Sequence, residues 1–399
     1  MKKITRFVVL VGLFTAALAV NAQSLTNKKD GGYKFTVIKD IEALEVQNQN
    51  RTGTCWSFSA LSFYESELIR MGKGKHKLSE MFIVRHAYAG KTESFVRFHG
   101  NNNMDEGGAF HDIPWVIKRH GIVPQEVYKG LNYGEETHNH SELTALLQAM
   151  VKVIIGNPQK KLTTSWQAAI NGVLDAYLGK LPTEFTYQGK KYTPQSFAKF
   201  LGLNMDDYVS ITSFTHHPFY EKFAIEIPDN WSLGLSYNVP LDEFMAIAEN
   251  AVTNGYGLAW GADVSEKGFA FREGLAILPE DESTINIKGK DNRHFNDAGA
   301  EKKSSAFDTP VKERIVSQEE RQKSFDNYET TDDHGMHITG IVKDQNGAKY
   351  FVVKNSWGKA NDCDGYFYTS MPYFRYKTIN YVVHKDALSK EMKTKLGIK

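Results

Sequence analysis

The sequence predicts an α+β fold with a helical first half and a β-rich second half. Residues 55–71 carry apolar side chains at helical spacing, namely Phe58, Leu61, Tyr64, Leu68 and Ile69. Residues 334–358 form two apolar stretches around Asp344-Gln345-Asn346-Gly347, which is the pattern of two strands joined by a turn. With 399 residues, the chain is long enough for a single domain that carries large insertions.

The first residues have the features of a secretory signal. Met1-Lys2-Lys3 is positively charged, residues 7–20 are apolar, and Val20-Asn21-Ala22 is a small-residue cleavage site. The apolar run of about 14 residues is shorter than the ~20 that span a bilayer, which argues against a membrane anchor. We therefore expect cleavage after Ala22 and export, to the periplasm or the medium, of a mature domain covering residues 23–399.

The overall composition excludes some classes of partner and scaffold. Because 48 basic residues nearly balance 47 acidic ones, we expect no nucleic-acid partner and no membrane association after signal cleavage. Cys55 and Cys363 are too few for a disulfide framework. They could form a single bridge, but the surroundings of Cys55 favour a free thiol, and the role of Cys363 is left open.

Cys55 lies where a polar, glycine-containing loop runs into the first predicted helix. Free backbone N–H groups and the helix dipole favour a thiolate at this position, and the thiolate is the nucleophilic form. Gln49, six residues upstream, could donate a hydrogen bond to the same oxygen as the Cys55 backbone N–H. Two such donors make an oxyanion hole. The alternative is a small buried cysteine beside a solvated loop glutamine.

The segment Asn48-Gln49 followed by Gly53-Thr54-Cys55-Trp56-Ser57-Phe58 resembles the active-site segment of papain-like cysteine peptidases. It lacks the cysteine that papain has three residues before the nucleophile. The bleomycin hydrolase and aminopeptidase C branch also lacks the corresponding disulfide, and the segment is closer to that branch. The resemblance implies that Cys55 is the nucleophile and that Gln49 and Cys55 form the oxyanion hole.

Gly107-Gly108 precedes an amphipathic stretch at residues 110–119. A Gly-Gly turn without a function is common. In papain-like enzymes a Gly-Gly pair at this place lines the substrate cleft, and glycine lets an extended peptide approach closely. We therefore expect Gly107 and Gly108 in the cleft.

The predicted strand pair at residues 334–358 carries a histidine and an asparagine suited to base catalysis. A general base must take the thiol proton, and an amide acceptor on its far nitrogen fixes the productive tautomer. Asn355-Ser356-Trp357-Gly358 and His334-Gly335-Met336 resemble the segments of the same peptidase branch. The resemblance implies that His334 is the base, that Asn355 orients it and that Trp357 shields their hydrogen bond. His337 is a rival base, but strand alternation places it on the opposite face.

The register of this hairpin sets a condition on the pair. A two-residue turn at Asn346-Gly347 would place Ile338 opposite Asn355 and leave His334 roughly 13 Å away along the strand. We therefore predict either a turn centred near Asp344-Gln345 or a β-bulge that shifts the register.

The spacing of the predicted site residues indicates large insertions. His334 follows Cys55 by 279 residues, whereas roughly 130–150 are typical of papain-like chains. Residues 130–210 read as amphipathic helices, and residues 280–330 are charged and predicted to be exposed. His216-His217 and His138-Asn139-His140 have no acidic or cysteine partner nearby in the sequence, so we expect no metal site and no organic cofactor.

The resemblance implies a papain-like fold, with a helical half that carries the catalytic helix and an antiparallel, β-barrel-like half. It also implies hydrolysis of peptide substrates through a Cys55 thioester, with aminopeptidase action favoured over endopeptidase action. A non-catalytic peptide-binding protein on the same scaffold is the alternative, and a transglutaminase-like acyltransferase fits the Gln49–Cys55 segment poorly. The branch suggests a ring-like homo-oligomer. In bleomycin hydrolases a C-terminal carboxylate meets the substrate amine, but whether Lys399 reaches the cleft is left open.

Overall fold

The structure is a computed structural model that describes residues 25–289 and 300–399. The predicted signal segment, residues 1–22, lies outside the described residues. Within the described ranges, no helix combines the length and the apolar character that crossing a membrane requires.

Helices dominate the first half of the chain and strands the second. The helices are α1 (Cys55–Arg70), α2 (Glu80–Arg97), α3 (Asp112–His120), α4 (Ser141–Ile155), α5 (Ser165–Leu178), α6 (Pro194–Leu201), α7 (Leu241–Thr253), α8 (Gln318–Asp326), α9 (Met371–Lys377) and α10 (Lys390–Lys395). The strands that start before residue 260 are β1 (Leu25–Thr26), β2 (Lys34–Asp40), β3 (Phe185–Tyr187), β4 (Lys190–Tyr192), β5 (Tyr208–Thr212), β6 (Lys222–Ala224), β7 (Leu235–Asn238) and β8 (Leu258–Ala262). The later strands are β9 (Phe269–Ala270), β10 (Leu275–Ala276), β11 (Asn286–Lys288), β12 (Glu301–Lys303), β13 (His334–Lys343), β14 (Lys349–Lys354), β15 (Tyr366–Ser370) and β16 (Thr378–His384).

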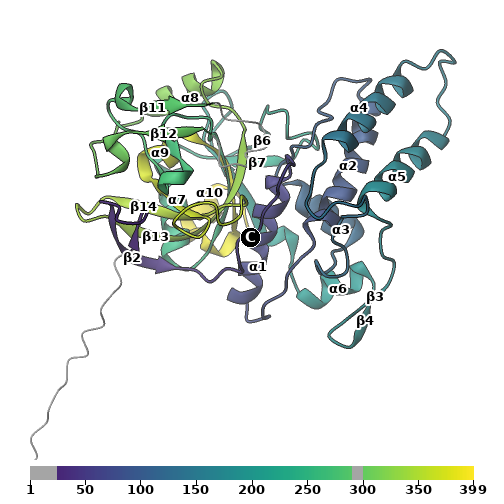
Figure 1. The fold of residues 1–399 in the computed structure, drawn as a ribbon, viewed down its shortest axis with the longest axis horizontal. Coiled ribbons are helices and arrows are strands. Elements are labelled where there is room, and N and C mark those ends of the chain that lie inside the picture. Colours follow the sequence, from purple (N-terminus) through teal and green to yellow (C-terminus); the bar gives the residue numbers. More distant parts are fainter. Residues whose placement is uncertain (1–24, 290–299) are drawn as a thin grey trace, which may run out of the picture.

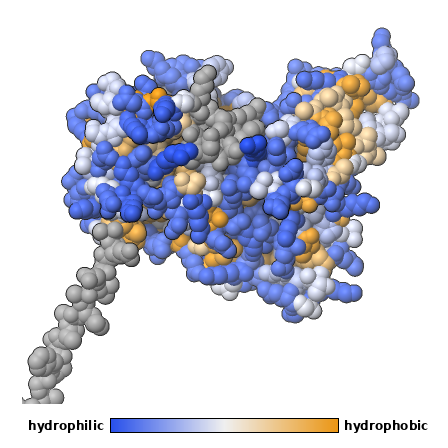
Figure 2. All heavy atoms as spheres, viewed as in Figure 1, coloured by the Kyte–Doolittle hydropathy of each residue, from blue (hydrophilic) through white to orange (hydrophobic). Residues whose placement is uncertain are grey.

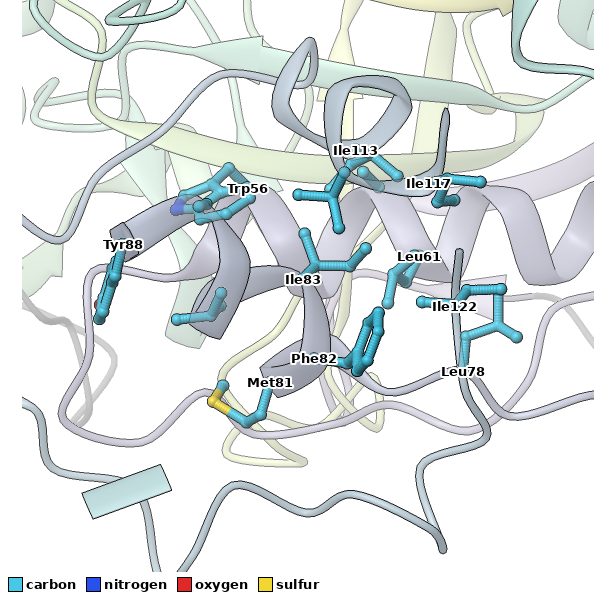
Figure 3. Close-up of a cluster of buried hydrophobic side chains, with 14 of the residues drawn as sticks. Trp56, Leu61, Leu78, Met81, Phe82, Ile83, Tyr88, Ile113, Ile117 and Ile122 are labelled. Atoms are coloured by element: carbon cyan, nitrogen blue, oxygen red, sulfur yellow. The ribbon is translucent and has the colours of Figure 1, made fainter. Parts of the chain in front are cut away.

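Helix α1 lies at the boundary between the helical half and the β-rich half (Figure 1). It packs against β13 and β8 on one side and against α2 and α3 on the other. Its first fourteen residues are all buried. The helix is therefore buried on all sides, and not only along the apolar face that the sequence predicted. Figure 3 shows part of the core on its helical side, where Trp56 and Leu61 face Ile83 of α2 and Ile113 of α3.

The β-rich half is built on one large sheet in the strand order β6-β7-β5-β16-β8-β13-β14-β15-β10-β9. Most neighbours are antiparallel, but β5 pairs with β7 and β10 with β15 in parallel. Among the described strands the sheet does not close into a barrel. The α+β class is therefore as predicted, whereas the barrel-like half is an open sheet.

The hairpin β13–β14 contains the predicted bulge. Lys343 pairs with Lys349, which leaves a five-residue loop from Asp344 to Ala348 in place of a tight turn. The register then shifts between Ile338 and Gly340. Thr339, at the bulge, marks where β13 exchanges one neighbour for another, because β8 pairs with residues 334–338 and β2 with residues 340–343.

Residues 130–210 contain α4, α5, the β3–β4 hairpin and α6. Helices α4 and α5 project from the helical half as a pair (Figure 1). One side of each helix packs inward through Leu143, Leu147 and Leu174. Apolar side chains also remain on the surface of this projection, as Figure 2 shows, and Val153 is 75% exposed. Surface patches of this kind are often sites of contact between molecules.

Many side chains in the described part of residues 280–330 are exposed, but the segment also contributes buried side chains to the fold. Phe307 packs into a small core with Tyr33 and Tyr350. Arg321 of α8 is 1% exposed, and its guanidinium donates to the backbone carbonyls of Ser213, Arg375, Tyr376 and Thr378. Some charged side chains of this segment are therefore solvated, whereas others bind backbone groups inside the fold.

Candidate active site

Cys55 is the first residue of α1 and is buried. The loop before it is tied to the Gly107 segment by Glu106, whose Oε2 accepts from the Gly53 N–H at 2.6 Å. Trp56 Nε1 donates to the Glu106 carbonyl at 3.1 Å. These bonds fix the start of α1, so the thiol is held where the free N–H groups of the helix point.

Gln49 lies on a loop that is pinned to the segment containing Asn355. Its backbone N–H donates to the Ser356 carbonyl at 2.9 Å, and its Oε1 accepts from Ser356 Oγ at 2.6 Å. The amide nitrogen donates to the Thr52 carbonyl at 2.7 Å. An amide has two N–H groups, so the second stays available for a ligand.

His334 and Asn355 are hydrogen-bonded to each other, in a hairpin whose register is shifted by the bulge at Thr339. His334 Nε2 lies 2.7 Å from Asn355 Oδ1, which can only accept, so Nε2 carries the proton. The Trp357 ring covers the imidazole, with ring centroids 4.6 Å apart and planes inclined by 31°. The Nδ1 atom is thereby left as the proton acceptor.

The rival His337 is turned away from the thiol. Its Nδ1 lies 2.9 Å from Ser62 Oγ, two helical turns beyond Cys55, which confirms the opposite faces predicted for the two histidines. Cys363 is also remote: both cysteines are free, and the Cys363 thiol donates to the Asn27 carbonyl at 2.9 Å. The single-bridge alternative is thus excluded in this structure.

A cavity of about 550 Å³ brings these groups together between the two halves. Gln49, Gly53 and Cys55 lie on one side, and Asp332, Asp333 and His334 come from the entry to β13. Asn103, Asp105, Glu106 and Gly107 come from the segment between α2 and α3, and Pro228 and Asp229 from the loop between β6 and β7. Among the described residues that follow His334, none lines this cavity.

Gly107 lines this cavity and Gly108 lines a small pocket beside Trp56, but the space next to each glycine is already filled. A Cβ added to Gly107 would lie 2.2 Å from an Asp229 oxygen, and one added to Gly108 would lie 2.8 Å from the Trp56 ring. Gly108 is therefore needed for packing on the nucleophile's helix. The space in front of Gly107 holds the carboxylate of Asp229.

A family model described as the Peptidase C1-like family matches residues 4–279 and 300–398. The chain belongs to this family. It is 23% identical to the aminopeptidase C of Streptococcus thermophilus over 94% of this chain and 87% of that protein, and 22% identical to the aminopeptidase G of Lactobacillus delbrueckii subsp. lactis over 88% and 83%. The crystal structure of PepW from Lactobacillus rhamnosis superposes with a TM-score of 0.68 at 21% identity, covering 91% of this chain and 84% of that one. The fold is thus papain-like.

In this Peptidase C1-like protein, burial disfavours a thiolate at Cys55 when His334 is neutral, and an imidazolium at His334 when Cys55 is neutral. Burial raises the pKa of Cys55 to about 12. It lowers the pKa of His334 to about 4, although the hydrogen bond that His334 donates to Asn355 acts in the opposite direction. Moving the thiol proton to the imidazole creates two opposite charges and no net charge, so the pair can ionise together where neither group would alone. The helix start and Asn355 then stabilise the two charges.

No acidic partner for His216 and His217 was expected from the sequence, but the fold supplies one. Their Nε2 atoms lie 3.0 and 2.7 Å from the two oxygens of Glu226. Gln322 donates to Nδ1 of His216 at 3.0 Å while its own oxygen accepts from the Thr215 N–H. The Nε2 of His216 therefore carries the proton and donates to Glu226, so that nitrogen has no lone pair for a metal in this arrangement.

Sequence reasoning missed three residues of this site. Glu106 organises the loop before the nucleophile, and Asp229 and Asp332 line the cavity beside it. Asp332 precedes His334 by two residues, so its position near the base could have suggested it. Asp229 belongs to a loop without a motif, and only the fold brings it near Cys55.

Proposed function

We propose that the chain is an exported cysteine aminopeptidase that hydrolyses peptides through a Cys55 thioester. The observation that supports it most strongly is the 2.7 Å bond between His334 and Asn355, together with the cavity that His334 and the thiol at the start of α1 both line. The relatives named aminopeptidase C and aminopeptidase G favour cleavage at a free amino terminus.

In the proposed reaction, His334 Nδ1 takes the thiol proton while Cys55 Sγ attacks the substrate carbonyl carbon. The resulting oxyanion accepts hydrogen bonds from the Cys55 backbone N–H and from Gln49 Nε2. The imidazolium then gives its proton to the leaving amine as the C–N bond breaks, which leaves a thioester. A water molecule, deprotonated by the same imidazole, attacks the thioester and releases the acid and the thiol.

Two reporters of one peptide bond test the specificity. We expect an aminoacyl reporter with a free amine to be hydrolysed and its N-acetylated form to be hydrolysed at least tenfold more slowly, with Cys55→Ala inactive on both. Equal rates on the two reporters would show an endopeptidase instead.

Alkylation separates an enzyme from a peptide-binding protein on the same scaffold. The Cys363→Ser variant leaves Cys55 as the single thiol of the chain. We expect iodoacetamide near neutral pH to modify it faster than free cysteine and to abolish hydrolysis in proportion. A thiol that reacts no faster than free cysteine, in a protein without turnover, would support the binding protein.

Export is tested on the protein made in a bacterial host. We expect the product in the periplasm or the medium to begin at Gln23. A chain that keeps Met1 and stays in the cytoplasm would contradict this part of the proposal.

A further inference from the structure

A loop of the β-rich half reaches onto the helical half beside the cavity. Residues 225–234, which we call the strap, connect β6 to β7 at one edge of the large sheet, next to the helical half (Figure 1). Trp231 of the strap is buried and packs in the same core as Trp56. Its Nε1 donates to Asp112 Oδ2 of α3 at 2.7 Å, and Ser232 Oγ donates to the other oxygen at 3.2 Å. The strap is thus anchored on both halves of the molecule.

Hydrogen bonds inside the strap fix its shape. The side chain of the buried Asn230 donates to the carbonyls of Ile225 and Gly234 and accepts from the Gly234 N–H. Asn102, on the helical side, donates to the Trp231 carbonyl at 3.1 Å. An asparagine that bonds both ends of its own loop holds that loop in one conformation. The strap is therefore a fixed wall of the cavity.

The strap places the Asp229 carboxylate directly against Gly107. Asn103 Nδ2 donates to Asp229 Oδ1 at 2.8 Å, and the charge of the buried Lys91 also acts on this carboxylate. The position that a Cβ of Gly107 would take lies 2.2 and 2.3 Å from the two carboxylate oxygens. Because its charge is countered within the protein, what Asp229 presents to the glycine is mainly its volume.

The space beyond Asp229 is filled as well. Asp229 and Ile227 of the strap line a cavity of about 20 Å³ together with Trp56 and Gly108. A cavity of this size holds about one water molecule, so no side chain of a peptide fits there. Asp229 also lines the larger cavity that holds the thiol, so it lies at the boundary between the two.

The chemistry of the site determines which part of a peptide would meet this wall. In the proposed reaction the leaving amine lies beside His334, which protonates it. The acyl part that is bonded to Cys55 then extends away from His334, toward Gly107 and the strap. The cavity of about 550 Å³ can hold the first residue. A second residue laid along the glycine backbone would meet the side chain of Asp229.

We propose that the strap limits the cleft to a single residue before the scissile bond, with the side chains of Asp229 and Ile227 as the barrier. This inference rests on the proposed function and adds the element that excludes longer acyl chains. The restriction is steric, so it depends on the size of residue 229 and not on its charge. A smaller side chain opens the cleft, whereas an uncharged side chain of the same size keeps it closed.

Binding to the Cys55→Ala variant tests the inference without turnover. The probe is an N-acetylated tripeptidyl aminocoumarin amide, which has three residues before the scissile bond. By calorimetry, we expect Asp229→Ala, added to Cys55→Ala, to raise the affinity for this probe by roughly tenfold, and Ile227→Ala by roughly threefold, because each removes part of a clash.

Two matched variants serve as controls, and both should leave the affinity unchanged. Asp229→Asn removes the charge and keeps the volume. Leu233→Ala shortens a strap side chain that is 59% exposed and lines neither cavity. With Cys55 restored, kcat/KM for hydrolysis of the same probe should follow the same order. Thermal unfolding followed by circular dichroism shows whether each variant folds, and Ile227→Ala still tests the barrier if Asp229→Ala does not.

Three results would overturn the inference: no gain in affinity in the folded alanine variants, an equal gain in Asp229→Asn, or no measurable binding of the probe to any variant. If the wild-type protein hydrolyses a free-amine aminoacyl reporter but the alanine variants gain nothing on the blocked probe, only the inference fails. If the alanine variants bind the probe more tightly but no protein with Cys55 hydrolyses either reporter, only the proposed function fails.

Discussion

Gln49 combines a fixed orientation with a spare hydrogen-bond donor. Its oxygen is taken by Ser356 and one of its N–H groups by Thr52, so the amide cannot flip without breaking both bonds. A donor that is already oriented loses little freedom when charge develops on the substrate, and this is why such donors favour the transition state.

Removing this donor should therefore affect the chemical step more than binding. We expect Gln49→Ala to lower kcat by about 10²-fold with little change in KM, the lower part of the range for one oxyanion donor. Gln47→Ala, on the same loop, should leave both constants unchanged, because its side chain is exposed and, among the described residues, hydrogen-bonds to the neighbouring Glu45 carbonyl. An equal loss in the two variants would mean that Gln49 only supports the loop.

The pH dependence of kcat/KM should report His334. The imidazole must be neutral to accept the thiol proton, so activity falls as the pH drops through its pKa of about 4. The hydrogen bond to Asn355 raises this pKa. Asn355→Ala should therefore move the acid limb to lower pH and reduce kcat by about 10²-fold. The exposed Asn346→Ala serves as the control, and an acid limb that stays in place would contradict the assigned partner.

At the scale of the elements, the site depends on the close approach of β13 to α1. Gly335 is the contact point, because an added Cβ would lie 2.8 Å from Ser59 Oγ and 3.2 Å from the Cα of Trp56. The strand can lie on the first turn of the helix only because this residue has no side chain. The distance between His334 and Cys55 is set by the same contact.

We predict that Gly335→Ala forces β13 away from α1. The expected cost is ~1–3 kcal/mol of stability, and kcat should fall by about 10²-fold because the base is displaced. Gly172→Ala is the opposite case, since nothing lies within 4 Å of its added Cβ. In the middle of α5 it should stabilise the protein by ~0.5–1 kcal/mol. Urea unfolding and steady-state kinetics of both variants check this, and a fully active Gly335→Ala would refute it.

Features set by neighbouring residues could be predicted from the sequence, and features set by distant contacts could not. Helix α1 begins at Cys55 and the β13–β14 pair lies where the apolar pattern placed it. The sequence indicated that a β-bulge or a shifted turn was needed, but not where a bulge would lie. Its position is set by the point where β13 stops pairing with β8 and starts pairing with β2. The burial of Arg321 could not be predicted, because the four carbonyl groups that its guanidinium binds lie in remote segments. Asp229 was missed for the same reason.

At the scale of the whole molecule, several buried carboxyl groups tie stability to pH. Burial raises the pKa of Asp112 in the helical half and of Glu313 in the β-rich half to about 7 in each case. The native state therefore holds these protons at a pH where the unfolded chain has released them. Their contribution is fully present below the ordinary carboxyl pKa and is lost as the pH rises through about 7.

We expect the free energy of unfolding to fall between pH 6 and pH 8, by about 1.4 kcal/mol for each such group. Glu313→Gln, which cannot ionise, should remove its share of this slope, whereas Glu280→Gln on the surface should not. Urea unfolding at pH 6, 7 and 8 measures the slopes. The same slope in wild type and Glu313→Gln would contradict the assignment.

The strand exchange in β13 also has a consequence for how the protein matures. Strand β2, near the start of the chain, pairs with residues 340–343, and the nucleophile meets its base only when β13 docks on α1. A ribosome that has made the first three hundred residues has therefore produced a thiol without a partner. Long-range pairing of this kind delays completion of the fold until most of the chain exists. A peptidase assembled in this order stays inactive during its own synthesis.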